Sequence, residues 1–85
     1  MEIMSIKVEN ETGLHARPAA EFVKLASEQA CEVFVEKDEK RVSAKSILGI
    51  LTLAITKGTV INIITDGENE KESMETLLNY IRNVI

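Results

Sequence analysis

The first segment of the chain alternates apolar and polar side chains, as a β-strand does when one face packs on a core and the other faces water. Met4, Ile6 and Val8 are separated by polar residues, and a loop over residues 10–13 follows. From Ala16 the apolar positions recur at helical spacing, which predicts an amphipathic helix of about three turns. Its apolar stripe consists of Ala19, Phe22, Val23, Ala26 and Ala30.

The middle of the chain predicts a hairpin and a short helix. Segments 32–37 and 40–44 carry β-branched and aromatic residues, and the charged pair Asp38-Glu39 separates them. Ser46 precedes an apolar segment over 47–53 and is a suitable N-cap for a helix there. Its apolar side chains point around most of the helix circumference. Either some stay exposed as a partner surface, or an irregular segment buries them all, and the sequence leaves both interpretations open.

The last part of the chain predicts a buried strand and a helix. Residues 60–65 are rich in β-branched side chains. Asn69 with Glu72 three residues later resembles a capping box. The apolar stripe of the following helix consists of Met74, Leu77, Leu78, Ile81 and Ile85. The order βαββαβα predicts one α+β domain over residues 1–85, an open-faced sandwich with a four-stranded antiparallel sheet and three helices on one face.

Composition and charge narrow the possible functions. A chain of 85 residues buries too little surface for a deep enclosed active site. Fourteen acidic against ten basic residues disfavour nucleic-acid binding. Neither a signal peptide nor an apolar run of membrane-spanning length is apparent, so we expect a cytoplasmic protein without membrane insertion, and small size with acidic charge favours a monomer. Cys31 and His15 are single residues of their kinds, so we expect no metal or other cofactor, and Cys31 is interpreted as a small core or surface thiol.

The candidate chemistry lies in His15-Ala16-Arg17-Pro18, where the first loop becomes the first helix. Proline suits a first helical turn, whose backbone N–H groups and positive end attract anions. That end also disfavours a charged imidazole, and a neutral imidazole is a nucleophile. If His15 attacks a phosphoryl group, the Ala16 backbone N–H and the Arg17 guanidinium could bind the phosphoryl oxygens. The alternative is an exposed or capping histidine without chemistry.

Two segments, Thr12–Ala20 and Ala44–Leu51, resemble the phosphocarrier family HPr of the bacterial phosphoenolpyruvate:sugar phosphotransferase system. The resemblance extends over essentially the whole chain. It implies that His15 accepts a phosphoryl group on Nδ1 from phosphorylated Enzyme I and donates it to a histidine of a sugar-specific Enzyme IIA, while Arg17 stabilises the phosphoryl charge. It further implies that partners dock on Ala20, Lys24, Ile47, Leu48 and Leu51.

The same resemblance implies a second phosphorylation, on Ser46, by an ATP-dependent HPr kinase/phosphorylase. The phosphoserine form would bind catabolite control protein A. A phosphate of about two negative charges beside an apolar docking patch would also repel an acidic partner. The alternative for Ser46 is an ordinary helix cap. Ala54 departs from the family, in which many members carry glycine there, and Ile47 and Leu48 replace a common methionine or phenylalanine.

The leading hypothesis is therefore a phosphocarrier for sugar uptake that passes through a covalent phosphohistidine and is not itself an enzyme. One alternative is a regulatory module of the same fold that acts mainly as a Ser46-phosphorylated corepressor in carbon catabolite repression. His15 beside Arg17 argues against a purely regulatory protein. A second alternative is an unrelated small α/β interaction domain, which requires both motifs to be coincidental.

Overall fold

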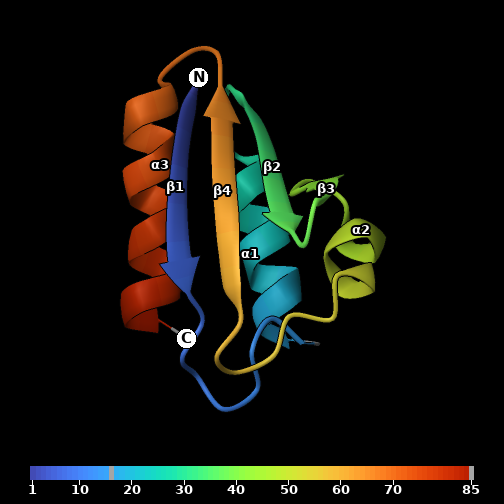
Figure 1. Cartoon of the computed structure of the whole chain (residues 1–85). Coiled ribbons are helices and arrows are strands. Elements are labelled where there is room, and N and C mark those ends of the chain that lie inside the picture. The colour runs from blue at the N-terminus through green and yellow to red at the C-terminus, as the bar shows by residue number, and fades with distance from the viewer. Residues whose placement is uncertain (16, 85) are drawn as a thin grey trace.

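The computed structural model describes residues 1–15 and 17–84 and contains one sheet covered by helices (Figure 1). The strands are β1 (Glu2–Lys7), β2 (Glu32–Lys37), β3 (Lys40–Ser43) and β4 (Val60–Asp66). The helices are α1 (Arg17–Ser27), α2 (Ile47–Thr52) and α3 (Glu70–Asn79), and α3 continues into a short π-helix, η1 (Tyr80–Val84). The predicted order βαββαβα is confirmed.

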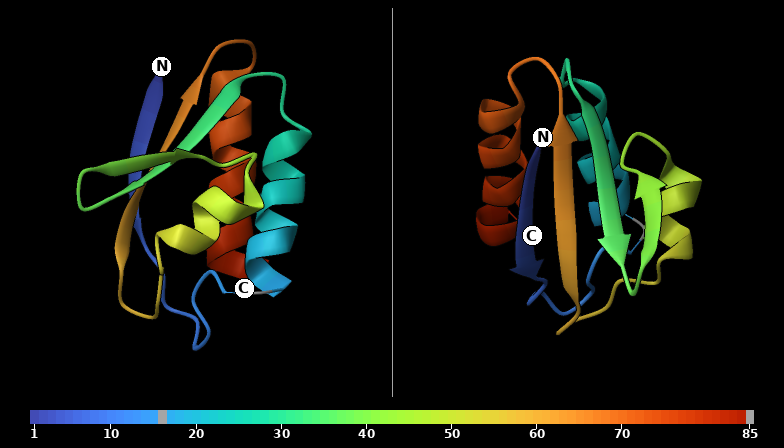
Figure 2. Two further views of the ribbon diagram at one scale, coloured as in Figure 1. Left: turned by 90° about the vertical axis from the view of Figure 1, so that its right-hand side faces the viewer. Right: turned by 45° about the horizontal axis from the view of Figure 1, so that its top comes forward.

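The four strands lie in the order β1-β4-β2-β3, and each pair of neighbours is antiparallel. β4 therefore lies between β1 and β2, with Ile63 opposite both Met4 and Val35. Helices α1 and α3 cover the same face of this sheet, and α2 lies beside β3 and α1 (Figure 2). The predicted open-faced α+β sandwich is confirmed.

Strand alternation directs one set of side chains toward the helices. Val33 of β2 and Ile63 of β4 are fully buried and share one core with Phe22 of α1 and Leu77 of α3. Burial of each large apolar side chain stabilises the fold by about 1.5–3 kcal/mol. Cys31 is 2% exposed and belongs to this core, so of the two placements expected for its thiol, core or surface, the structure has the core.

The opposite face of the sheet carries a polar row that crosses all four strands. Ser5 of β1 donates a hydrogen bond to Asn62 of β4 (2.5 Å), and the Asn62 amide donates to Glu36 of β2 (3.3 Å). Arg41 of β3 pairs with the same glutamate at 3.7 Å. These side chains keep the face compatible with water, which is why helices are needed on one side only.

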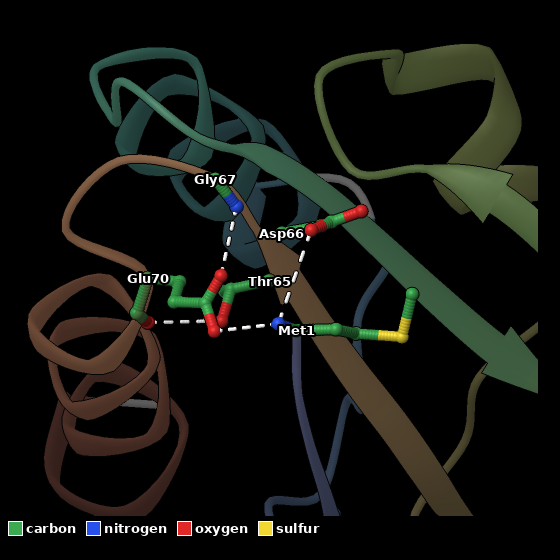
Figure 3. Close-up of polar contacts among 5 residues, drawn as sticks. All are labelled: Met1, Thr65, Asp66, Gly67 and Glu70. Carbon is green, nitrogen blue, oxygen red and sulfur yellow. Dashed lines mark hydrogen bonds and ion pairs between the residues drawn. The ribbon is translucent and has the colours of Figure 1, made fainter.

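The capping box predicted at Asn69 and Glu72 is wrong. Asn69 has a left-handed backbone (φ 58°) and makes no capping hydrogen bond with its side chain, because an N-cap needs an extended backbone to reach the helix amides. The Glu70 carboxylate instead accepts hydrogen bonds from the Gly67 amide (2.9 Å) and the Met1 ammonium (2.6 Å), as Figure 3 shows. The Gly67 hydrogen bond, followed by that ammonium, lowers the pKa of Glu70.

Several element boundaries also differ from the sequence pattern. β1 begins at Glu2 rather than Met4, because pairing with β4 extends to Thr65. α1 ends at Ser27, and tight turns after it leave the expected stripe residue Ala30 exposed. Ile85, expected on the stripe of the last helix, lies outside the described residues. Within the described residues no helix has the length and apolarity to cross a membrane.

Candidate functional site

His15 follows a loop that is tightly joined to the segment after α2. Gly13 has a φ of +60°, and a Cβ there would collide with the carbonyl oxygen of Ile55. That carbonyl accepts a hydrogen bond from the Leu14 amide (3.1 Å), and the Leu14 side chain is 2% exposed. A buried residue thus immediately precedes His15, whose own side chain is exposed. The loop presents the imidazole to solvent from a well-packed base.

The first turn of α1 places Arg17 two residues beyond His15. Its side chain is 89% exposed, and its Nε lies 3.8 Å from Oε2 of Glu21, one turn further along the helix. Pro18 occupies the first turn as expected. Ala16, whose backbone N–H was expected to contact a phosphoryl group, lies outside the described residues. The site therefore combines an accessible imidazole with an accessible cation.

The sequence reasoning missed the contact between Glu21 on α1 and Tyr80 at the start of η1. The Tyr80 hydroxyl donates to Oε1 of Glu21 (2.9 Å) and also lies within hydrogen-bonding distance of the Pro18 carbonyl oxygen (3.3 Å). Tyr80 begins η1, which continues α3, and α3 lies beside α1 on the same face of the sheet (Figure 2). The spacing of Arg17 and Glu21 is a readable sequence signal for a helical ion pair. Nothing in the sequence joins Glu21 to a tyrosine 59 positions away.

Ser46 caps α2 as expected. Its backbone is extended and its Oγ accepts a hydrogen bond from the Gly49 amide (3.1 Å). The residue is exposed, so the hydroxyl is reachable from solvent. The ordinary capping role is therefore confirmed, and it does not conflict with modification of the same oxygen.

The two interpretations of the apolar α2 segment are now resolved. Ile50 is fully buried, whereas Ile47, Leu48 and Leu51 are 38, 72 and 40% exposed. α2 buries one stripe because it contacts β3 on one side and α1 on the other. On α1, Ala20 and Lys24 are exposed. The resemblance predicts that partners dock on this exposed set, which we call the docking surface: Ala20, Lys24, Ile47, Leu48 and Leu51.

The end of α2 is held by a lysine that the sequence reasoning did not single out. Lys37 on β2 donates hydrogen bonds to the carbonyl oxygens of Leu53 (2.8 Å) and Ala54 (3.2 Å). Ala54, which stands where many family members carry glycine, has a left-handed φ of 51°. The next residue, Ile55, supports the His15 loop. Lys37 therefore connects the sheet to both the end of α2 and the segment that supports the loop of His15.

The chain resembles known proteins along nearly its whole length. It is 50% identical to the HPr-like protein Crh of Halalkalibacterium halodurans over 76 residues, 89% of this chain and 90% of that one. It is 47% identical to the phosphocarrier protein HPr of Neisseria meningitidis over 77 residues, 91% of this chain and 86% of that one. The crystal structure of HPr from Thermoanaerobacter tengcongensis matches with a TM-score of 0.93 and 44% identity, covering 95% of this chain and 91% of that one.

Some related structures weigh against the expectation of a monomer. The crystal structure of Crh from Bacillus subtilis is described as a dimer with a swapping domain. It matches with a TM-score of 0.78 and 45% identity, covering 94% of this chain and 92% of that one. Small size and acidic charge, on which the expectation rests, do not prevent a chain of this fold from exchanging an element with a second copy.

A family match includes both of the segments discussed above. Residues 4–83 match the family described as "PTS HPr component phosphorylation site". The matched range contains the His15 loop, α1, Ser46 and α2, and it leaves out only three residues before it and two after it. Together with the shared fold, this match is specific. The chain therefore belongs to the HPr family of phosphocarrier proteins of the phosphotransferase system.

Proposed function

We propose that the protein carries phosphoryl groups from phosphorylated Enzyme I to a histidine of a sugar-specific Enzyme IIA by way of His15. The lone pair on Nδ1 attacks phosphorus, a P–N bond forms to His15, and the bond from phosphorus to the donor breaks. In the second transfer the same P–N bond breaks as the acceptor histidine attacks. The observation that carries this proposal is the exposed imidazole on a loop fastened by Leu14 and Gly13.

Arg17 supplies the charge that the transferred group requires. Its guanidinium is planar and suited to phosphate oxygens, and it is accessible within the first turn of α1. The amino-terminal end of the helix adds backbone N–H groups, including that of Ala16, and a positive potential. An open arrangement of this kind suits an intermediate that must pass its phosphoryl group on.

The docking surface supplies contact with the partners. Its apolar side chains come from α2, which lies against α1, so they form a patch beside the helix that begins two residues after His15. Lys24 adds a positive charge suited to an acidic partner. Both Enzyme I and Enzyme IIA would use this surface in turn, as a carrier requires. We place this relay in the cytoplasm.

Ser46 is proposed as the regulatory site, phosphorylated by HPr kinase/phosphorylase with ATP. The hydroxyl is exposed and directly precedes Ile47 of the docking surface. A phosphate there would add about two negative charges beside apolar side chains that a relay partner must desolvate. It would weaken docking of acidic relay partners and offer a new charged feature to catabolite control protein A.

A second candidate function is that of a corepressor acting mainly through phosphorylated Ser46. The 50% identity to an HPr-like protein Crh supports it without favouring it over the carrier. Reconstitution separates the two. With phosphoenolpyruvate and Enzyme I, a carrier acquires an acid-labile, alkali-stable phosphoryl group that is lost in His15→Ala and retained in Ser46→Ala. With ATP and HPr kinase/phosphorylase, an acid-stable group appears that Ser46→Ala abolishes.

Absence of the acid-labile group in the first reaction would contradict the carrier function. Arg17→Glu serves as the test of the cation: transfer slows strongly while the fold persists by circular dichroism. Lys71→Glu on α3 makes the same charge reversal on another exposed residue and is the matched control. Equal transfer rates in the two variants would contradict the role of Arg17.

A further inference from the structure

Arg17 has an acidic neighbour on its own helix. The Arg17 guanidinium and the Glu21 carboxylate lie 3.8 Å apart, and both side chains are at least half exposed. Residues four apart on a helix attract one another when their charges are opposite. In the unphosphorylated protein this attraction draws the guanidinium along α1. A phosphoryl group on His15 must then compete with a carboxylate for the same cation.

The Glu21 carboxylate is itself held from the other end of the chain. Its Oε1 accepts the hydrogen bond from Tyr80, and the Tyr80 ring is 8% exposed and lies 6.2 Å from the ring of Phe22. Burial and the Glu21 carboxylate raise the pKa of Tyr80 to about 12, so its hydroxyl keeps its proton and remains a donor at neutral pH. One oxygen of Glu21 is thereby occupied, and the carboxylate is tied to a residue that the core holds in place.

We infer that Glu21, held by Tyr80, is a positioning residue that pairs with Arg17 until His15 is phosphorylated and then releases it. This inference rests on the proposed function of His15. A phosphoryl group carries about two negative charges. Glu21 carries one, and its carboxylate already accepts a hydrogen bond from Tyr80. Arg17 therefore changes partner on phosphorylation. Tyr80 keeps the Glu21 carboxylate from following the guanidinium toward the phosphoryl group.

Two substitutions shift this competition in opposite directions. Glu21→Gln keeps an acceptor for Tyr80 and removes the charge that competes for Arg17. The equilibrium constant for transfer from phospho-Enzyme I to the protein should therefore rise about twofold, which corresponds to the free energy of an exposed helical ion pair. Tyr80→Phe frees both oxygens of Glu21 for Arg17, and the same constant should fall about twofold. Glu75→Gln on α3 removes an equal charge from another exposed glutamate and should change nothing.

The double variant separates positioning from simple packing. If Tyr80 acts through Glu21, Tyr80→Phe has no effect on the transfer equilibrium in the Glu21→Gln background. An equal fall in both backgrounds means that Tyr80 acts only through the fold and overturns the inference. So does a Glu21→Gln variant that behaves like Glu75→Gln.

A measurement without Enzyme I makes the inference independent of the relay. The ¹⁵Nε–¹Hε signal of Arg17 reports its partner, and potassium phosphoramidate can phosphorylate the imidazole chemically. Before phosphorylation the signal should differ between the unsubstituted protein and Glu21→Gln, and after it the two should converge. Identical signals before phosphorylation overturn the inference, as does a difference that persists after it. Failure of Enzyme I to phosphorylate His15 contradicts the proposed function alone.

Discussion

Replacing Lys37 with methionine tests whether the sheet supports the end of α2 and the loop of His15. The Lys37 ammonium on β2 donates to the carbonyl oxygens of Leu53 and Ala54, which follow α2. Leu53 is the C-cap residue of α2 and Ala54 comes directly after it, so neither carbonyl has a partner within the helix, and a cation is also favourable at a helix C-terminus. Methionine keeps most of the apolar stem and removes only the charged donor.

The size of the effect follows from the surroundings of the two hydrogen bonds. A hydrogen bond to a charged group contributes about 1.5–3 kcal/mol when it is shielded from water. The bond to Leu53 is partly buried and the bond to Ala54 is exposed, so the second contributes little. We expect Lys37→Met to lower the free energy of unfolding by about 1.5 kcal/mol. For a domain of this size the Tm falls by about 6–12 °C.

We expect the same substitution to loosen the His15 loop as well. Ile55 follows the two carbonyls and accepts the Leu14 amide hydrogen bond, so loosening this segment weakens the support of the residue before His15. Thermal unfolding by circular dichroism measures the stability, and the Leu14 amide signal in a ¹⁵N correlation spectrum measures the local change. Lys37→Arg keeps a cation and should lose less stability than Lys37→Met.

The matched control is Lys40→Met, on the exposed end of the neighbouring strand β3. It makes the same chemical change on the same hairpin without touching α2. If Lys37→Met and Lys40→Met unfold at the same temperature, the two hydrogen bonds contribute nothing and the reasoning is refuted. A Lys37→Met variant that loses stability while its Leu14 amide signal stays unchanged refutes the connection to the loop.

Three further substitutions test the backbone and the electrostatics. Gly13→Ala should cost about 3 kcal/mol and slow His15 phosphorylation, because the residue has a positive φ and its Cβ would meet the Ile55 carbonyl; chemical denaturation without a loss contradicts this. Ala54→Gly should raise stability by about 1 kcal/mol by relieving a left-handed alanine, measured as a higher Tm. Glu70→Gln should lower the Tm at neutral pH. Because the fold lowers the pKa of Glu70, this difference from the unsubstituted protein should vanish as the pH falls through the acidic range, and a constant difference at all pH values would contradict it.

Local patterns were sufficient for most of the fold. The buried face of an element can be inferred from residues that are close together in the sequence. Examples are the alternation in β1, the β-branched run of β4 and the helical stripe around Phe22. The Ser46 cap is equally local, since donor and acceptor are three residues apart. The capping box at Asn69 failed because the turn geometry there is set by the contacts of Glu70 with Gly67 and Met1.

The sequence by itself determined which residues form the candidate site, because His15, Arg17 and Pro18 are neighbours in a single loop and helix turn. It did not determine which apolar side chains of α2 stay in water, since that depends on how the helix packs against β3 and α1. Nor did it reveal the contact of Tyr80 with Glu21 or that of Lys37 with the end of α2. These pairs are 59 and at least 16 residues apart, and only the packing of helices on the sheet brings their atoms within hydrogen-bonding distance.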